Sequence, residues 1–137
     1  ARSLAPGRRP FHTLNPALAR LADGSTLVYG CMGGEGQPQT QAAVFARHVL
    51  HGIGLQRAVS RPRWLLGRTW GAESVTLKLE SRFEPGLFDA LADAGHQVEA
   101  VGAYDEVMGH AGAIRLYPDG RLEGATDPRS DGAVAGF

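Results

Sequence analysis

A cluster of glycines in the first third of the chain places the tightest constraint on its fold. Four glycines fall within the seven residues from Gly30 to Gly36, in the run YGCMGGEGQPQ. An apolar, β-prone stretch precedes this run, and a stretch with helical periodicity follows it. Glycine adopts backbone conformations that other residues avoid, so the chain is expected to turn sharply from a strand into a helix here.

The glycine cluster does not fit the common nucleotide-binding loops. A P-loop requires a lysine and then Ser or Thr after its last glycine, but Gly36 is followed by Gln37 and Pro38. The dinucleotide pattern G-x-G-x-x-G also fails, because Gln39 stands where a small residue is required. Two interpretations stay open. One is a plain tight connection, and the other is a turn whose N–H groups, aided by the helix dipole, stabilise the oxyanion of an acyl transfer.

The composition indicates a globular protein with a single core. The chain has 137 residues, of which 43% are hydrophobic and 20% are charged. Its 14 basic and 14 acidic residues cancel, which argues against nucleic acid or an acidic membrane surface as a partner. No apolar run reaches the roughly 18 residues that a membrane span needs. Cys31 is the single cysteine, so an internal disulfide is excluded and the compartment is undecided.

Turn residues and hydrophobic periodicity predict an α+β or layered α/β fold with mostly antiparallel strands, in the order β-β-α-α-β-β-α-β-β-β. Asp23-Gly24 and Pro118-Asp119-Gly120 are typical hairpin turns. Gly52 and Gly95 are typical residues for the ends of helices. The expected segments are strands 11–21 and 25–30, a helix from Thr40 to His51, a short helix stopped by Pro62, a strand over 74–80, a helix and strand over 84–101, and a hairpin over 112–127.

Two histidines and the cysteine are candidates for chemistry, but structural roles explain them better. His48 and His51 lie three residues apart on a predicted helix and can share one face. A metal would need further ligands, and the other histidines lie in unrelated contexts, so no metal site is predicted. Cys31 ends an apolar strand without a histidine partner, which is typical of a small buried hydrophobe rather than a nucleophile.

The remaining candidates also favour structural roles. Trp64 and Trp70 can line a cleft, but packing is the more frequent use of tryptophan. Asp127 and Arg129 flank Pro128 in TDPRSDG and are expected to pair as a clamp. The chain therefore offers turn-borne donors but no nucleophile with its base, which indicates part of a site rather than a whole one.

Six blocks of the sequence together resemble the C-terminal part of the γ-glutamyltransferase (γ-glutamyltranspeptidase) family. They cover nearly the whole chain, in the family's order and at its separations. The FHTLNP version of the first block is similar to the bacterial γ-glutamyltransferase-like branch, whose substrates are often less well defined than those of the glutathione enzymes. The resemblance leaves the compartment open between the bacterial cytoplasm and the periplasm. The six blocks are RRPFHTLNPAL, DG, MGGEGQPQTQ, GIGLQRAVSRPRW, LFDALADAGHQVE and DGRLEGATDPRSDGAVAGF.

The resemblance implies part of an N-terminal-nucleophile hydrolase with an αββα sandwich. Members of the family cleave themselves into a large and a small subunit, and the new terminal threonine of the small subunit is the nucleophile. Its α-amino group serves as the base. A γ-glutamyl group passes to this threonine and then to water or to an amine acceptor. No separate cofactor is implied.

The family's functional positions fall on two pairs of residues in this chain. Gly33 and Gly34 match the paired glycines whose N–H groups form the oxyanion hole. His12 and Thr13 stand where glutathione-processing members have two serines that hold the substrate's α-carboxylate. Thr13 retains a hydroxyl, whereas His12 departs from the pattern and weakens the case for γ-glutamyl specificity. Gln37 and Gln39 are expected to support the glycine turn.

The nucleophile of the family has no counterpart in this chain, which starts with Ala1 in the Pro/Arg/Gly-rich opening ARSLAPGRRP. We therefore expect residues 1–137 to be a single C-terminal segment of a small subunit, partnered by the large subunit or the missing N-terminal half. The segment alone should not turn over a γ-glutamyl anilide, and its uncovered apolar faces should favour self-association. Two alternatives are a noncatalytic binding or scaffold domain and an acylase of changed acyl specificity.

Overall fold

The computed structural model describes residues 3–71 and 73–136. It confirms the α+β class and the predicted order of strands and α-helices. A π-helical turn extends the first helix, and a 3₁₀ turn precedes β6. The bounds are β1 Ala17–Arg20, β2 Thr26–Met32, α1 Gly36–Phe45, the π-helical turn Ala46–Leu50, α2 Leu55–Ser60, β3 Trp64–Leu66, β4 Leu77–Glu80, α3 Pro85–Asp93, β5 Val98–Val101, the 3₁₀ turn Glu106–Met108, β6 His110–Leu116 and β7 Leu122–Thr126.

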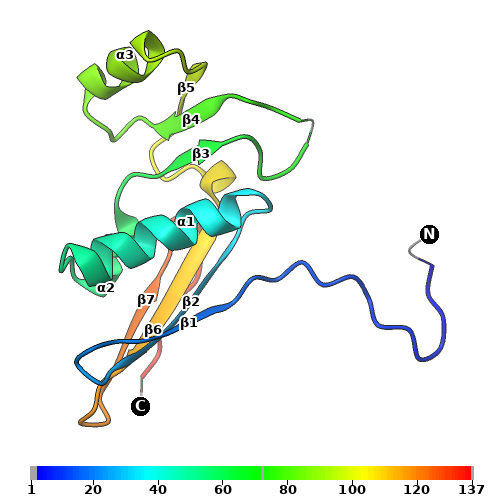
Figure 1. The fold of residues 1–137 in the computed structure, drawn as a ribbon, viewed down its shortest axis with the longest axis vertical. Helices are drawn as coiled ribbons and strands as arrows, with labels where there is room; N and C mark the ends of the chain where they lie inside the picture. Colours follow the sequence, from blue (N-terminus) through cyan, green and yellow to red (C-terminus); the bar gives the residue numbers. More distant parts are fainter. Residues whose placement is uncertain (1–2, 72, 137) are drawn as a thin grey trace.

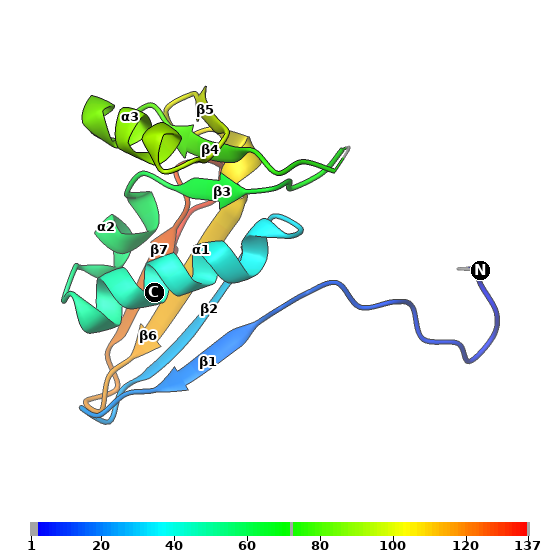
Figure 2. The ribbon, with the colours of Figure 1, turned by 45° about the horizontal axis from the view of Figure 1, so that its top comes forward.

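The larger sheet has the strand order β1-β2-β6-β7, and every pairing in it is antiparallel. Helices α1 and α2 cover one face of this sheet (Figures 1 and 2). Because side chains alternate along a strand, every second residue of the sheet points toward the helices. The resulting core joins Leu27, Ala113 and Ala125 of the strands to Val44 of α1 and the α2 residues Leu55 and Val59.

Helix α1 begins four residues earlier than the periodicity predicts. It starts at Gly36 rather than Thr40, directly after the glycine turn, and Pro38 lies in its first turn. Proline is tolerated there because the first N–H groups of a helix have no partner within the helix. The chain then widens into the π-helical turn and leaves it at Gly52, whose φ of +64° confirms the predicted end.

A smaller sheet has the order β3-β4-β5. Strands β3 and β4 are antiparallel, whereas β4 and β5 are parallel because α3 carries the chain back between them. Helix α3 ends before Gly95, whose φ is +94°, as the sequence predicts. An apolar hollow of about 380 Å³ lies between α3 and this sheet, and its lining includes Trp64, Leu66, Leu87 and Leu91.

The segment before β1 departs from the prediction. A strand was expected from residue 11 onward, but regular pairing starts only at Ala17, opposite Tyr29. Residues 8–16 form an exposed arm that extends away from the sheet (Figures 1 and 2). Pro10 and Pro16 lack the N–H group that a strand donates, which explains why the pairing stops at this point.

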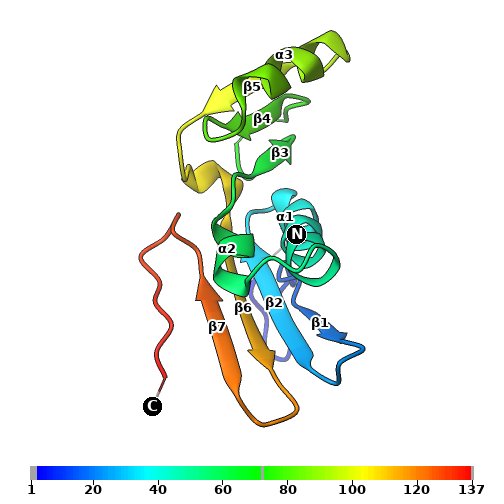
Figure 3. The same cartoon turned by 90° about the vertical axis from the view of Figure 1, so that its left-hand side faces the viewer.

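The face of the larger sheet opposite the helices carries an apolar row, which we call the outer row: Leu18, Val28 and Ile114. These residues are directly opposite one another across β1, β2 and β6, and they are 64%, 47% and 55% exposed. The row continues to Gly124 of β7, over which Val134 of the C-terminal tail is packed. Figure 3 shows this tail running beside β7. Exposed apolar rows of this kind are typical of surfaces that pack against another layer.

Candidate functional site

The glycine cluster forms the connection between β2 and α1, as predicted. Gly33 has a φ of +147° and Gly34 a φ of +50°, conformations that other residues rarely adopt. The Gly33 carbonyl accepts the N–H of Gly36 at 2.8 Å, and the Gly34 carbonyl accepts the N–H of Gln37 at 3.2 Å. The N–H groups of Gly33 and Gly34 donate to no acceptor within residues 3–71 and 73–136. They lie at the positive end of the α1 dipole.

Backbone from two other segments contacts the glycine turn on either side. A Cβ on Gly33 would lie 3.2 Å from the Cα of Gly109. A Cβ on Gly34 would overlap the carbonyl oxygen of Thr69. Positive φ angles and steric contact therefore act together, and glycine is required at both positions.

One pocket brings the four predicted site residues together. It has a volume of about 440 Å³ and is lined by His12, Thr13, Gly33 and Gly34, with the rest of segments 12–16 and 30–34 and with Gln37. The pocket forms because the arm diverges from β2 before Ala17, which leaves the last three residues of β2 without a neighbour on that edge. The predicted substrate-binding pair and the predicted oxyanion pair thus face the same space.

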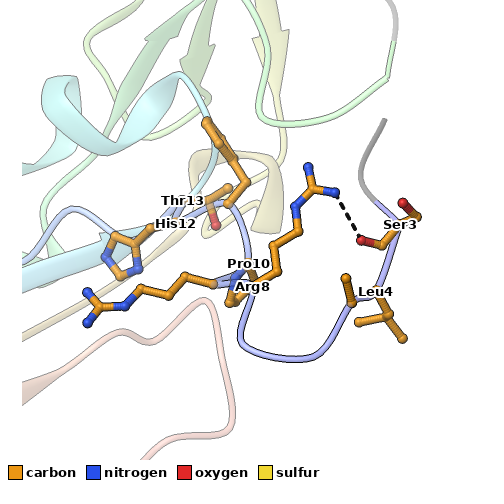
Figure 4. Close-up of a pocket in the computed structure, with 9 residues that line it drawn as sticks. Ser3, Leu4, Arg8, Pro10, His12 and Thr13 are labelled. Carbon is orange, nitrogen blue, oxygen red and sulfur yellow. Dashed lines mark hydrogen bonds between the residues drawn. The ribbon is translucent and has the colours of Figure 1, made fainter.

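A second pocket, of about 760 Å³, lies within the arm itself and is lined by residues 3–5 and 8–13. Figure 4 shows His12 and Thr13 at the end of the arm nearest the sheet, with Ser3 and Leu4 at the far end. The guanidinium of Arg8 donates to the Ser3 carbonyl at 3.3 Å across this curl. His12 and Thr13 line both pockets and so mark the junction between the arm and the glycine turn.

Three glutamines of α1 fasten the helix to the segments around the pocket. Gln37 donates to the Thr13 carbonyl at 3.1 Å, and Gln41 donates to the Asn15 carbonyl at 2.5 Å. Gln39 exchanges two hydrogen bonds of 2.9 Å with the backbone of Leu66 in β3. Gln37 and Gln41 are four residues apart on one helix face and hold the arm, while Gln39 holds the smaller sheet. The support of the glycine turn by Gln37 and Gln39 stays a prediction.

A buried cluster of charged side chains lies behind the glycine turn. Asp127 accepts hydrogen bonds from Arg63 and, at 3.0 Å, from Arg129. Arg129 also forms a forked pair with Glu80, with both N···O distances at 2.6 Å. All four residues are at most 7% exposed. The predicted clamp of Asp127 and Arg129 is confirmed, and it extends to two partners that sequence analysis did not identify.

Arg63 connects this ion cluster to the segment behind Gly33. Its Nη1 donates to the carbonyl oxygens of Met108 and Gly109 at 3.1 Å each. Burial lowers the pKa of Arg63 to about 9, because a low-dielectric surrounding disfavours the charged form. The backbone beside Gly33 is therefore held by a buried guanidinium.

The contacts of Cys31 and His48 are those of structural residues rather than of a nucleophile or a metal ligand. Cys31 is half-buried, and burial raises the pKa of its thiol, which is unfavourable for a nucleophile. His48 is a core histidine whose two ring nitrogens contact the Ile53 carbonyl and the Arg115 guanidinium, each at 2.8 Å. In the described ranges, no group of three or more His, Cys, Asp or Glu side chains is arranged to hold a metal.

Two further predictions concern tryptophan and membrane association. Trp64 packs in the hollow beside α3, whereas Trp70 lies in the loop after β3 and is 53% exposed. No helix in the described part of the chain is long and apolar enough to cross a membrane.

Comparisons with known proteins identify the family. The family model of gamma-glutamyltranspeptidase matches residues 1–137. The oxamate amidohydrolase proenzyme of Klebsiella pneumoniae is 63% identical over 98% of this chain and 26% of its own length. The glutathione hydrolase-like YwrD proenzyme of Bacillus subtilis is 48% identical over the same shares. The chain thus spans about a quarter of the length of these curated relatives.

A solved structure agrees with the sequence matches. The gamma-glutamyltranspeptidase of Pseudomonas nitroreducens, as its mutant W525D, superposes with a TM-score of 0.73 at 24% identity, over 98% of this chain and 67% of that one. This likeness shows the fold of an N-terminal-nucleophile hydrolase. With the glycine turn, the whole-chain family match and these relatives in agreement, the chain belongs to the γ-glutamyltranspeptidase family.

Proposed function

We propose that this segment supplies the oxyanion donors and part of the acyl pocket of an amide-cleaving enzyme, and that the rest of the protein brings the nucleophilic threonine. The observation that carries the proposal is the shared pocket of His12, Thr13, Gly33 and Gly34. Two N–H groups of the glycine turn are free to bind an oxyanion, while an imidazole and a hydroxyl lie beside them to bind a carboxylate.

In this proposal the threonine hydroxyl attacks the amide carbonyl, and its proton passes through the α-amino group to the leaving amine. The negative charge that develops on the carbonyl oxygen is stabilised by Gly33 and Gly34. Water then cleaves the acyl ester and releases the acid. Each oxyanion donor contributes about 3–4 kcal/mol to transition-state stabilisation in enzymes of this kind.

For the substrate, we propose a small amide with an adjacent carboxylate, with oxamate as the first candidate. The relative that is 63% identical is named for oxamate hydrolysis. In this chain His12 replaces one of the paired serines that the resemblance links to γ-glutamyl binding. A γ-glutamyl amide is the second candidate, supported by the 48% identity to a glutathione hydrolase-like proenzyme. Water, rather than an amine, is the expected acceptor in the first case.

The outer row supports the proposal that this chain works as part of a larger protein. Leu18, Val28 and Ile114 are exposed here, and the curated relatives are about four times as long. We propose that the rest of the same protein covers this face, as the second sheet of the sandwich. The isolated segment should then self-associate, and sedimentation velocity would reveal a stable polar monomer if this idea were wrong.

The substrate proposal is tested with the purified full-length, self-cleaved enzyme. Ammonium release from oxamate and p-nitroaniline release from γ-glutamyl-p-nitroanilide are measured side by side, with the 137-residue segment as an inactive control. We expect kcat/KM for oxamate to be at least about tenfold higher. H12A should raise the KM for oxamate about 10- to 100-fold, because a hydrogen bond to a charged group contributes about 1.5–3 kcal/mol.

The matched control is H51A, since His51 is an exposed histidine at the end of the π-helical turn. Equal effects of H12A and H51A would contradict the assignment of His12. Efficient hydrolysis of the γ-glutamyl anilide without any oxamate turnover would select the second substrate. A full-length protein that cleaves neither amide, although it is self-cleaved, would favour the scaffold alternative.

A further inference from the structure

Thr69 lies at a point where three separate parts of the chain meet. It belongs to the loop between β3 and β4, and it is half-buried. Its hydroxyl donates a hydrogen bond to the carbonyl of Val107, in the 3₁₀ turn that precedes β6. Its own carbonyl oxygen lies so close to Gly34 that a Cβ on this glycine would overlap it. One residue therefore contacts both the glycine turn and the segment behind it.

The segment that receives the Thr69 hydroxyl is itself well fixed. Asp105 caps the 3₁₀ turn by accepting the N–H of Val107 at 3.0 Å. Met108 is 2% exposed, and its carbonyl accepts Arg63 at 3.1 Å. Gly109, the next residue, packs against Gly33. The 3₁₀ turn and Gly109 thus form a rigid support for the first glycine of the turn.

The loop that carries Thr69 has weaker attachments of its own near the turn. Arg68 pairs with Glu35 at 3.4 Å, but the side chains are 31% and 60% exposed. Ion pairs at this exposure contribute little. The hydroxyl of Thr69, in contrast, joins the loop through a part-buried hydrogen bond to Val107, which directly precedes the buried residues Met108 and Gly109.

We infer that Thr69 is a positioning residue that holds Gly34 against the buried support, so that the two free N–H groups of the glycine turn keep a fixed direction into the pocket. This inference rests on the proposed function and adds a residue to it. Thr69 does not line the glycine pocket, and it acts through Gly34. Gly67 is held by Thr76 and Lys78, each at 3.1 Å. Without the hydroxyl, the residues after Gly67 lose their contact with Val107, and the Thr69 carbonyl that restrains Gly34 becomes free to move.

The test compares T69V with T69S in the full-length enzyme. Valine has nearly the shape of threonine but no hydroxyl, whereas serine keeps the hydroxyl and loses the methyl group. The matched control is T76V, which makes the same change at the other end of the loop, where no hydrogen bond of the Thr76 hydroxyl is found among the described residues. Two readouts are measured: steady-state amide hydrolysis, and hydrogen–deuterium exchange of the peptide that contains residues 33–39.

We expect T69V to lower kcat about 10- to 100-fold with KM within about threefold of the original value, because a misplacement near 1 Å can cost about a hundredfold in rate. Exchange at the N–H groups of Gly36 and Gln37 should accelerate in T69V only, since both donate within the turn. T69S should retain activity within about threefold, and T76V should resemble the unmodified enzyme.

The two readouts separate this inference from the proposed function. Unchanged exchange across residues 33–39 in T69V overturns the positioning role, whatever the enzyme's activity. Faster exchange with unchanged kcat overturns it as well, because the direction of the N–H groups would then not matter. Faster exchange in a protein whose unmodified form cleaves no amide supports the positioning of the turn and overturns the proposed function.

Discussion

Replacing Asp127 by asparagine should destabilise the protein severely. Both carboxylate oxygens of Asp127 are fully used: one accepts the N–H and Nη1 of Arg129 at 3.0 Å each, and the other accepts Arg63 and the N–H of Ala111 at 2.6 Å. All of these partners are donors. The side-chain amide of the D127N variant, in either orientation, points its NH₂ group at two of these donors. Two hydrogen bonds are then lost, and the NH₂ group faces other donors instead of an acceptor.

The magnitude follows from the charges that remain. In the described part of the chain, Arg63, Arg129 and Arg82 form ion pairs in this cluster with two carboxylates, Glu80 and Asp127. Asp127 is 1% exposed, so water cannot replace the missing carboxylate. Breaking a buried ion pair by removing one partner costs about 3–5 kcal/mol, which is a large fraction of the roughly 5–15 kcal/mol that stabilise a typical domain.

The assay is urea unfolding of the full-length protein, followed by the fluorescence of its tryptophans. The control is D119N, because Asp119 also accepts a backbone N–H, from Arg121 at 3.0 Å, but lies in an exposed hairpin turn. We expect D119N to change the free energy of unfolding by less than about 1 kcal/mol. If D127N unfolded at the same urea concentration as D119N, the cluster would not be the structural clamp that its contacts indicate.

Two further predictions concern the surroundings of the glycine turn. G109A should destabilise the protein by about 2–5 kcal/mol in the same urea assay. The positive φ of +73° at this position costs alanine about 1–2 kcal/mol, and the overlap of its Cβ with the Met32 carbonyl costs about 1–3 kcal/mol more. The control is G120A, because Gly120 has a φ of +86° but open space around it. Cys31 should react with iodoacetamide more slowly than free cysteine at pH 8, as followed by mass spectrometry, because burial raises the pKa of its thiol; labelling at the rate of free cysteine would show that the thiol is solvated.

The parts of the fold that the sequence predicted are those fixed by local interactions. Gly24 and Gly120 close their hairpins with φ angles of +82° and +86°, and Gly95 ends α3 with +94°. Each needs only a few neighbouring residues to adopt its conformation, so a short stretch of sequence contains the signal. The same holds for Gly33 and Gly34, whose conformation follows from a strand that turns directly into a helix.

The missed contacts join residues that are far apart in the chain. The Thr69 hydroxyl reaches Val107 across 38 positions, and Arg129 reaches Glu80 across 49. No periodicity or turn pattern records such a pairing. The one available signal was the spacing of Gln37 and Gln41, which places two amides on the same side of α1, where both donate to the arm. The sequence predicts a strand over residues 11–16 of the arm, but Pro16 cannot donate to a sheet ladder, and regular pairing begins only after it.

The structure also bears on the two interpretations of the glycine cluster. A plain turn gains nothing from unpaired donors, and an unpaired buried N–H costs about 1–3 kcal/mol. The buried carboxylate of Asp127, in contrast, accepts four hydrogen bonds. Gly33 is buried and lines the pocket, and the backbone of Gly109 and Thr69 lies directly against the glycine turn. Unpaired donors in a turn of this kind are suited to an acceptor that arrives with the substrate, and this is why we propose the oxyanion interpretation rather than the plain connection.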